Sequence, residues 1–146
     1  MNIKRSLLLL LAVPALCAAQ ATPDPVLAKA AAEKGAVVTD SGLVFLSLKE
    51  GNGANPTATN VVRVHYRGTF PGGKEFDSSY ARKEPAEFPL NRVIPCWTEG
   101  VQKIKVGGKA RLTCPAAIAY GPRGAPPDIP PNATLLFEVE LLGIVR

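Results

Sequence analysis

The chain has 146 residues, of which 47% are hydrophobic and 20% charged, a balance typical of a globular domain and not of a wholly disordered chain. Its 13 glycines and 14 prolines are too many for a helical bundle and favour strands and structured loops. The single histidine and the three cysteines exclude a multi-histidine metal site and a cysteine-rich zinc module, so we expect no metal. The formal net charge is +5, and without Lys4 and Arg5 of the N-terminal segment it is +3, which is spread along the chain and indicates no nucleic-acid partner.

The first 21 residues have the features of a secretory signal peptide. Residues 4–5 are basic, residues 7–16 are apolar apart from one proline, and residues 19–21 (Ala-Gln-Ala) fit a signal-peptidase site. A membrane anchor fits poorly, because a span of the bilayer takes about 20 apolar residues. A lipoprotein would need a small residue before Cys17, where the chain has Leu16. We therefore expect a periplasmic or secreted bacterial protein, with no membrane association after the signal peptide is cleaved.

Residues 22–42 are predicted to form an arm or linker with one short helix over residues 25–34, and residues 43–146 to form the globular domain. Strand signals follow in chain order at residues 44–48, 61–70, 74–76, 109–114 and 135–142. Trp97, Val101 and Ile104 recur at helical spacing and predict a single helix inside the domain. Residues 120–132 contain five prolines, which predict a stiff loop of the kind that often carries function.

Apolar and polar residues alternate along the longer predicted strands. Val62, Val64 and Tyr66 share one face of their strand, and Thr113 is predicted to point outward from the strand at residues 109–114. Such alternation indicates a sheet with one face on the core and the other exposed to solvent, and hence antiparallel pairing. The predicted fold class is therefore α+β, a curved antiparallel sheet wrapped around one short helix.

The sequence lacks the usual signatures of phosphate binding and of nucleophilic catalysis. It has neither a G-x-x-x-x-G-K-[ST] loop nor a G-x-S-x-G elbow, and His65 lies in mid-strand, where a structural role is expected. Aromatic residues instead recur on the predicted inner faces. Tyr66 and Tyr120 suit the wall of a pocket, since a buried phenol needs a polar partner for its hydroxyl. Asp77 would place one carboxylate at the rim of this cluster, or would alternatively cap a turn.

Two cysteines remain once the signal peptide is removed. Cys96 and Cys114 make an even count in an exported protein, which favours a disulfide between them. Its loop-closure entropy would contribute about 3 kcal/mol to stability. Two buried free thiols, each packing as a small apolar side chain, are the alternative.

Six stretches in the same order along the domain carry a resemblance to a known family. They are VHYRG (64–68), GKEFDSS (73–79), VIPCWTEGVQ (93–102), VGGKARLTCP (106–115), AYG (119–121) and IPPNATLLFEVELL (129–142). Together they strongly resemble the FKBP-type peptidyl-prolyl cis-trans isomerases, and among these the exported bacterial members close to the macrophage infectivity potentiator group. The fold of that family agrees with the fold expected from the strand pattern.

The resemblance implies a site made of ten residues. Carried over by position, the catalytic residues are Tyr66, Phe76, Asp77, Trp97, Tyr120 and Phe137, and the substrate-binding residues are Arg82, Val93, Ile94 and Ile129. Trp97 would form the floor of an apolar pocket. The backbone N–H of Ile94 and the hydroxyl of Tyr120 would hold substrate carbonyls. Asp77 would join Tyr66 and Arg82 in a polar network.

The resemblance also implies proline-containing polypeptide clients, no cofactor, and macrolides such as tacrolimus and rapamycin as inhibitors. The arm is much shorter than the dimerisation region of the infectivity potentiators, so we expect a monomer. Four positions depart from the family pattern, namely Ala86, Arg92, Ala125 and Asp128. They bear on macrolide affinity and on sequence preference beside the proline. Two other functions stay open, a binding module or chaperone that holds proline-containing segments without turnover, and a structural β domain whose aromatic residues are all core.

Overall fold

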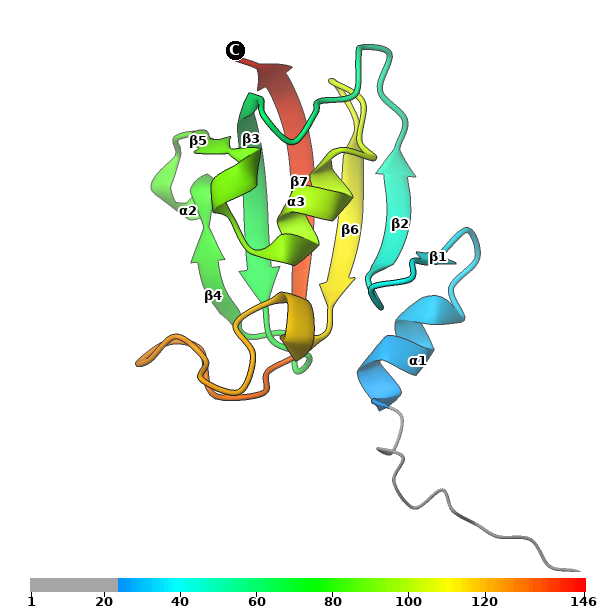
Figure 1. Ribbon diagram of the computed structural model, residues 1–146, viewed down its shortest axis with the longest axis vertical. Coiled ribbons are helices and arrows are strands. Elements are labelled where there is room, and N and C mark those ends of the chain that lie inside the picture. The colour runs from blue at the N-terminus through cyan, green and yellow to red at the C-terminus, as the bar shows by residue number, and fades with distance from the viewer. Residues whose placement is uncertain (1–23) are drawn as a thin grey trace, which may run out of the picture.

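The computed structural model describes residues 24–146 (Figure 1). The predicted signal peptide, residues 1–21, lies outside this part of the chain. Within residues 24–146, no helix is long and apolar enough to cross a membrane.

A seven-stranded antiparallel sheet forms the body of the domain. Its order is β1-β2-β6-β7-β3-β4, and β5 also pairs with β3. The strands are β1 (Val37–Val38), β2 (Val44–Lys49), β3 (Val61–Thr69), β4 (Glu75–Ser78), β5 (Ala86–Pro89), β6 (Lys109–Cys114) and β7 (Leu135–Ile144). All five predicted strands are therefore present, and the long central strands β3 and β7 pair with each other over most of their length.

One short helix, α3 (Pro95–Val101), lies across one face of this sheet (Figure 1). The alternation along β3 buries Val62, Val64 and Tyr66 toward the helix, as predicted. Trp97 and Val101 of α3 are buried against the same face. The structure thus confirms an α+β fold in which an antiparallel sheet packs on a short helix.

The helix α3 ends earlier than its apolar spacing predicted, since that spacing included Ile104. It begins at Pro95, where a proline fits the first turn because the N–H that it lacks would have no helical partner. It ends at Val101 and not at Ile104. The N–H groups of Lys103 and Ile104 bond carbonyls only three residues back, at 3.0 Å each, so the chain tightens into turns there. Ile104 is still buried in the core.

Residues 24–42 pack against the sheet. Helix α1 (Pro25–Ala31) is three residues shorter than predicted, and Val37 and Val38 extend the edge of the sheet as β1. Arg111 of β6 donates to the carboxylate of Glu33 just beyond α1, at 2.8 Å. Thr113 lies on the same face of β6 and is only 1% exposed, because α1 covers it. The prediction of an outward Thr113 is right about the face and wrong about its contact with solvent.

Besides β1, four short elements were not foreseen from periodicity. They are α2 (Ser79–Arg82), the 3-10 turns η2 (Leu90–Arg92) and η3 (Ala116–Ile118), and the strand β5. Each has three or four residues, too few to show a helical or strand period. The proline-rich loop after η3 is pinned by two backbone hydrogen bonds between Ala125 and Ile129, both of 2.9 Å.

Candidate active site

A pocket of about 460 Å³ opens between α3, the adjoining strands of the sheet and the start of the proline-rich loop. Its lining is mostly aromatic and aliphatic. The lining residues are Tyr66, Phe76, Asp77, Phe88, Arg92, Val93, Ile94, Trp97, Tyr120 and Phe137. Eight of them are among the ten residues that the sequence predicted for the site. An apolar hollow with a few polar groups is the usual form of a small binding site.

Trp97 forms the floor of the pocket. Its indole is buried, and the rings of Tyr66, Phe88 and Phe137 meet it edge-on, with centroids 5.2, 5.4 and 5.5 Å away and planes 85–89° apart. The edge of one aromatic ring is attracted to the face of another, which fixes the position of the indole. The buried Nε1 of Trp97 has no hydrogen-bond partner among residues 24–146.

A glycine in β3 makes room for the walls. A Cβ atom at Gly68 would lie 2.6 Å from Cζ of Phe76 and 3.0 Å from Cε1 of Phe137. The first distance is too short for two carbon atoms and the second is tight, so any larger residue would push the ring of Phe76 aside. The two rings contact each other edge-on, with centroids 5.7 Å apart.

A polar corner closes one side of the pocket. The hydroxyl of Tyr66 donates to Oδ2 of Asp77 at 2.5 Å, and Nη1 of Arg82 donates to Oδ1 of the same carboxylate at 2.5 Å. Nη2 of Arg82 also donates to the hydroxyl of Tyr66 at 3.0 Å. The single turn of α2 brings Arg82 back over Asp77. The N-cap of that turn is Ser78, whose hydroxyl accepts from the N–H of Ala81, while the Asp77 carboxylate belongs to the corner.

The protonation states follow from these contacts. Burial acts to raise the pKa of Asp77, but the hydrogen bonds from Tyr66 and Arg82 and the charge of Arg82 outweigh it and leave that pKa lowered. Burial, together with the hydrogen bond to Asp77, raises the pKa of Tyr66. Burial and the nearby charge of Asp77 raise the pKa of Tyr120. At neutral pH the pocket therefore holds the Asp77 carboxylate and the neutral phenols of Tyr66 and Tyr120.

Two hydrogen-bond donors at the pocket have no acceptor among residues 24–146. The N–H of Ile94, which precedes α3, bonds to no backbone or side-chain group there. The hydroxyl of Tyr120 is likewise without a partner, and that side chain is 40% exposed. Both groups can therefore donate to a carbonyl that enters the pocket.

Two of the predicted site residues lie behind the lining. Arg82 contacts the pocket only through Tyr66 and Asp77. Ile129 is buried in the hydrophobic core, where it closes the proline-rich loop. The sequence analysis in turn missed Phe88 and the pocket position of Arg92. Phe88 lies opposite Val62 in the sheet, and β5 is too short for its own alternation to have revealed this position.

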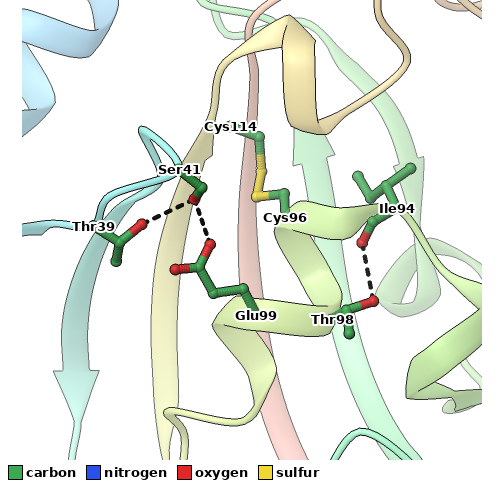
Figure 2. Close-up of a disulfide and its surroundings, with 7 residues drawn as sticks. All are labelled: Thr39, Ser41, Ile94, Cys96, Thr98, Glu99 and Cys114. Atoms are coloured by element: carbon green, nitrogen blue, oxygen red, sulfur yellow. Dashed lines mark hydrogen bonds between the residues drawn. A yellow bond between two sulfur atoms is a disulfide. The ribbon is translucent and has the colours of Figure 1, made fainter.

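A disulfide joins the floor helix to the sheet. Cys96 at the start of α3 is bonded to Cys114 at the end of β6, with their Cα atoms 5.9 Å apart (Figure 2). Both residues are fully buried. Figure 2 also shows Glu99 of α3 accepting a hydrogen bond from Ser41, at 2.5 Å, in the segment before β2. The helix that carries Trp97 is thus tied to β6 by the disulfide and to the segment before β2 by a hydrogen bond.

His65 lies outside the site. It faces away from the core, where its Nδ1 lies 2.8 Å from Oγ of Ser79 and its ring stacks on Tyr80 at 4.7 Å. Within residues 24–146, no three His, Cys, Asp or Glu side chains are grouped so that they could hold a metal ion.

The sequence profile of the family described as FKBP-type peptidyl-prolyl cis-trans isomerase matches residues 53–142. The chain belongs to this family. It is 52% identical over 120 residues to the isomerase FkpA of Aeromonas hydrophila, covering 82% of this chain and 44% of that protein. It is 53% identical over 115 residues to the FKBP-type 22 kDa isomerase of Escherichia coli, covering 79% of this chain and 56% of that protein.

Solved structures of FKBP-type and other peptidyl-prolyl isomerases share the fold. FkpA from Escherichia coli superposes with a TM-score of 0.80 at 48% identity, over 82% of this chain and 56% of that one. The isomerase from Pseudomonas syringae superposes with a TM-score of 0.78 at 36% identity, over 84% of this chain and 90% of that one. The chain spans about half the length of the curated FKBP-type relatives that it matches.

Proposed function

We propose that this FKBP-type chain catalyses cis-trans isomerisation of Xaa-Pro peptide bonds in exported polypeptides, with the proline ring held over Trp97. The observation that carries the proposal is the aromatic floor beside two donors without acceptors, Ile94 N–H and Tyr120 Oη. Rotation about a peptide bond breaks no σ bond, so the reaction needs neither a nucleophile nor a metal ion. The site provides what such a rotation does need, namely a shaped apolar surface and a few oriented hydrogen-bond donors.

The barrier that the enzyme must lower arises from the electronic structure of the amide. Resonance gives the C–N bond partial double-bond character and a rotation barrier of about 18–20 kcal/mol. At Xaa-Pro bonds both isomers are populated and exchange over tens of seconds or longer. In the twisted state the amide dipole is reduced, so an aromatic pocket with little water stabilises that state better than the planar ones.

The polar groups orient the substrate in this proposal. Ile94 N–H and the Tyr120 hydroxyl hold the carbonyls that flank the proline, and the hydrogen-bonded Tyr66–Asp77–Arg82 corner keeps the pocket wall in place. We assign the catalytic role to Tyr66, Phe76, Asp77, Trp97, Tyr120 and Phe137. Val93 and Ile94 bind substrate directly, whereas Arg82 and Ile129 support the residues that do.

The cellular setting is part of the proposal. Cleavage after residue 21 would release an arm of residues 22–42 and an isomerase domain of residues 43–146 into an oxidising compartment. A disulfide between Cys96 and Cys114 suits such a compartment, because reducing cytosols keep thiols free. The clients are proline-containing polypeptides, macrolides of the tacrolimus and rapamycin type compete for the pocket, and the protein acts as a monomer.

A matched pair of tyrosine variants tests the site. Tyr120→Phe should lower kcat/KM for a Phe-Pro peptide by about 2- to 10-fold, the worth of one hydrogen bond. Tyr80→Phe is the control, because Tyr80 is equally exposed at 40% but lies outside the pocket. Equal rates in wild type and both variants would reject Tyr120 as a substrate donor.

The same protein distinguishes an enzyme from a holding chaperone. A catalyst accelerates proline-limited refolding of a client at substoichiometric dose, whereas a chaperone must match its client in amount. Acceleration by a few per cent of enzyme supports the proposal. A folded protein that binds the peptide and never speeds its exchange rejects it in favour of the binding module.

A further inference from the structure

Arg92 lies at the pocket without an internal partner. It is the last residue of η2, it is exposed, and it is one of the residues that line the pocket. Other arginines of the domain bond to carboxylates within 2.8 Å, namely Arg63, Arg67, Arg82 and Arg111. Arg92 makes no ion pair or side-chain hydrogen bond with any residue from 24 to 146. Its five N–H donors are therefore free to meet a ligand.

Among the described residues that line this pocket, no free carboxylate balances the positive charge of Arg92. Among the lining residues that the structure describes, Asp77 is the only acidic one, and both of its oxygens are taken by Tyr66 and Arg82. The pocket therefore presents an apolar floor, a neutralised acidic corner and one unpaired cation. A guanidinium in this position suits a planar carboxylate, which it can bind through two parallel N–H donors.

The backbone that carries Arg92 is held in place. The hydroxyl of Thr98 in α3 donates to the carbonyl of Leu90 in η2 at 2.6 Å, which ties the turn to the floor helix. Arg92 precedes Ile94 by two residues, and the N–H of Ile94 is the proposed donor to a substrate carbonyl. Residues of an extended substrate are about 3.3–3.6 Å apart, so a side chain next to the proline lies within reach of an arginine on this wall.

We propose that Arg92 is a specificity-determining residue, which makes this isomerase prefer proline segments with an acidic side chain directly before or after the proline. The inference rests on the isomerase function proposed above. Because Arg92 is exposed, the expected preference for Glu over Gln in kcat/KM is about 1.5- to 5-fold. It should shrink as added salt screens the pair.

The test compares six peptides that carry Glu, Gln or Lys immediately before or immediately after the proline. Exchange is followed by NMR at low ionic strength, without a coupled protease whose own preference would interfere. The full chain is compared with Arg92→Gln, with Arg92→Glu, and with Lys103→Gln as a control. Lys103 is exposed and lies outside the pocket, so its loss changes the net charge equally.

At one position or both, the Glu/Gln ratio should exceed one in wild type and Lys103→Gln, and fall to about one in Arg92→Gln. In Arg92→Glu, the Lys peptide should become the favoured one. Equal rates for all wild-type peptides, or a preference for Glu that survives in Arg92→Gln, overturn the inference while the isomerase function stands. If no peptide is isomerised, the proposed function fails, and the same ratios measured as Kd decide the role of Arg92.

Discussion

Reduction of the Cys96–Cys114 disulfide should destabilise the domain by about 3 kcal/mol. The two cysteines are 18 residues apart in the sequence, and a closed loop of that length restricts the unfolded chain by an entropy worth about 3 kcal/mol at 25 °C. Both side chains are fully buried in the folded protein and pack between α3 and β6. The thiols can stay in place after reduction, so the folded state keeps its packing. The stability falls because the unfolded chain, freed of the cross-link, gains conformational entropy.

Urea unfolding of the oxidised and reduced protein measures this difference. Trp97 is the only tryptophan in the chain and neighbours Cys96, so its fluorescence reports on the region that the disulfide holds. For a domain of this size the m-value is about 1–3 kcal/mol per molar urea, so the midpoint should fall by about 1–3 M on reduction. The double variant Cys96→Ala, Cys114→Ala should have a still lower midpoint, because it also loses the packing of two buried sulfur atoms.

Two outcomes would contradict this reasoning. If the oxidised and reduced proteins unfold at the same urea concentration, loop closure does not stabilise this domain. If reduction leaves the product of m-value and midpoint, which is the free energy of unfolding in water, unchanged, the disulfide alters the compactness of the unfolded chain without stabilising the fold.

Three further predictions concern the pocket and the core. Gly68→Ala should cost about 1–3 kcal/mol and lower activity, because the new methyl group displaces Phe76; Gly72→Ala, where a Cβ meets no atom within 4 Å, should change neither quantity. Asp77→Asn should lower the thermal midpoint at pH 7, and the deficit should shrink below about pH 4, because a carboxylate with a lowered pKa stabilises the fold above its unfolded pKa and loses that effect as acid protonates it; a deficit that is constant from pH 7 to pH 2.5 contradicts this. Leu112→Ala, fully buried under α3, should cost about 2–5 kcal/mol in urea unfolding, and a cost below 1 kcal/mol would show that the core collapses around the cavity.

The strands could be read from the sequence because their signal is local. In β3 every second residue is buried, and the pattern of Val62, Val64 and Tyr66 follows from the pleat alone. The stripe of Trp97, Val101 and Ile104 located the floor helix in the same way, although turns in the backbone moved its end. The resemblance then assigned a site of which eight residues line the pocket.

Other features depend on contacts between segments that are distant in sequence. By the alternation along β6, Thr113 lies on the outward face, yet α1 packs over it. The sequence near Thr113 does not predict this contact. Phe88 enters the pocket because β5 pairs with β3, and four residues are too few to show this by their own period. The sequence placed Ile129 in the site by position, whereas the packing of the proline-rich loop puts it in the core.

By itself the sequence determined the fold class, the order of the strands along the chain and the aromatic character of the site, since burial that repeats every second residue is a property of one strand. Only the tertiary structure decided which charged side chains are paired and which are not. Asp77 is bonded by Arg82 and Tyr66, whereas Arg92 has no partner among residues 24–146. Charge pairing depends on distances of a few ångströms between separate elements, and no local pattern encodes those distances.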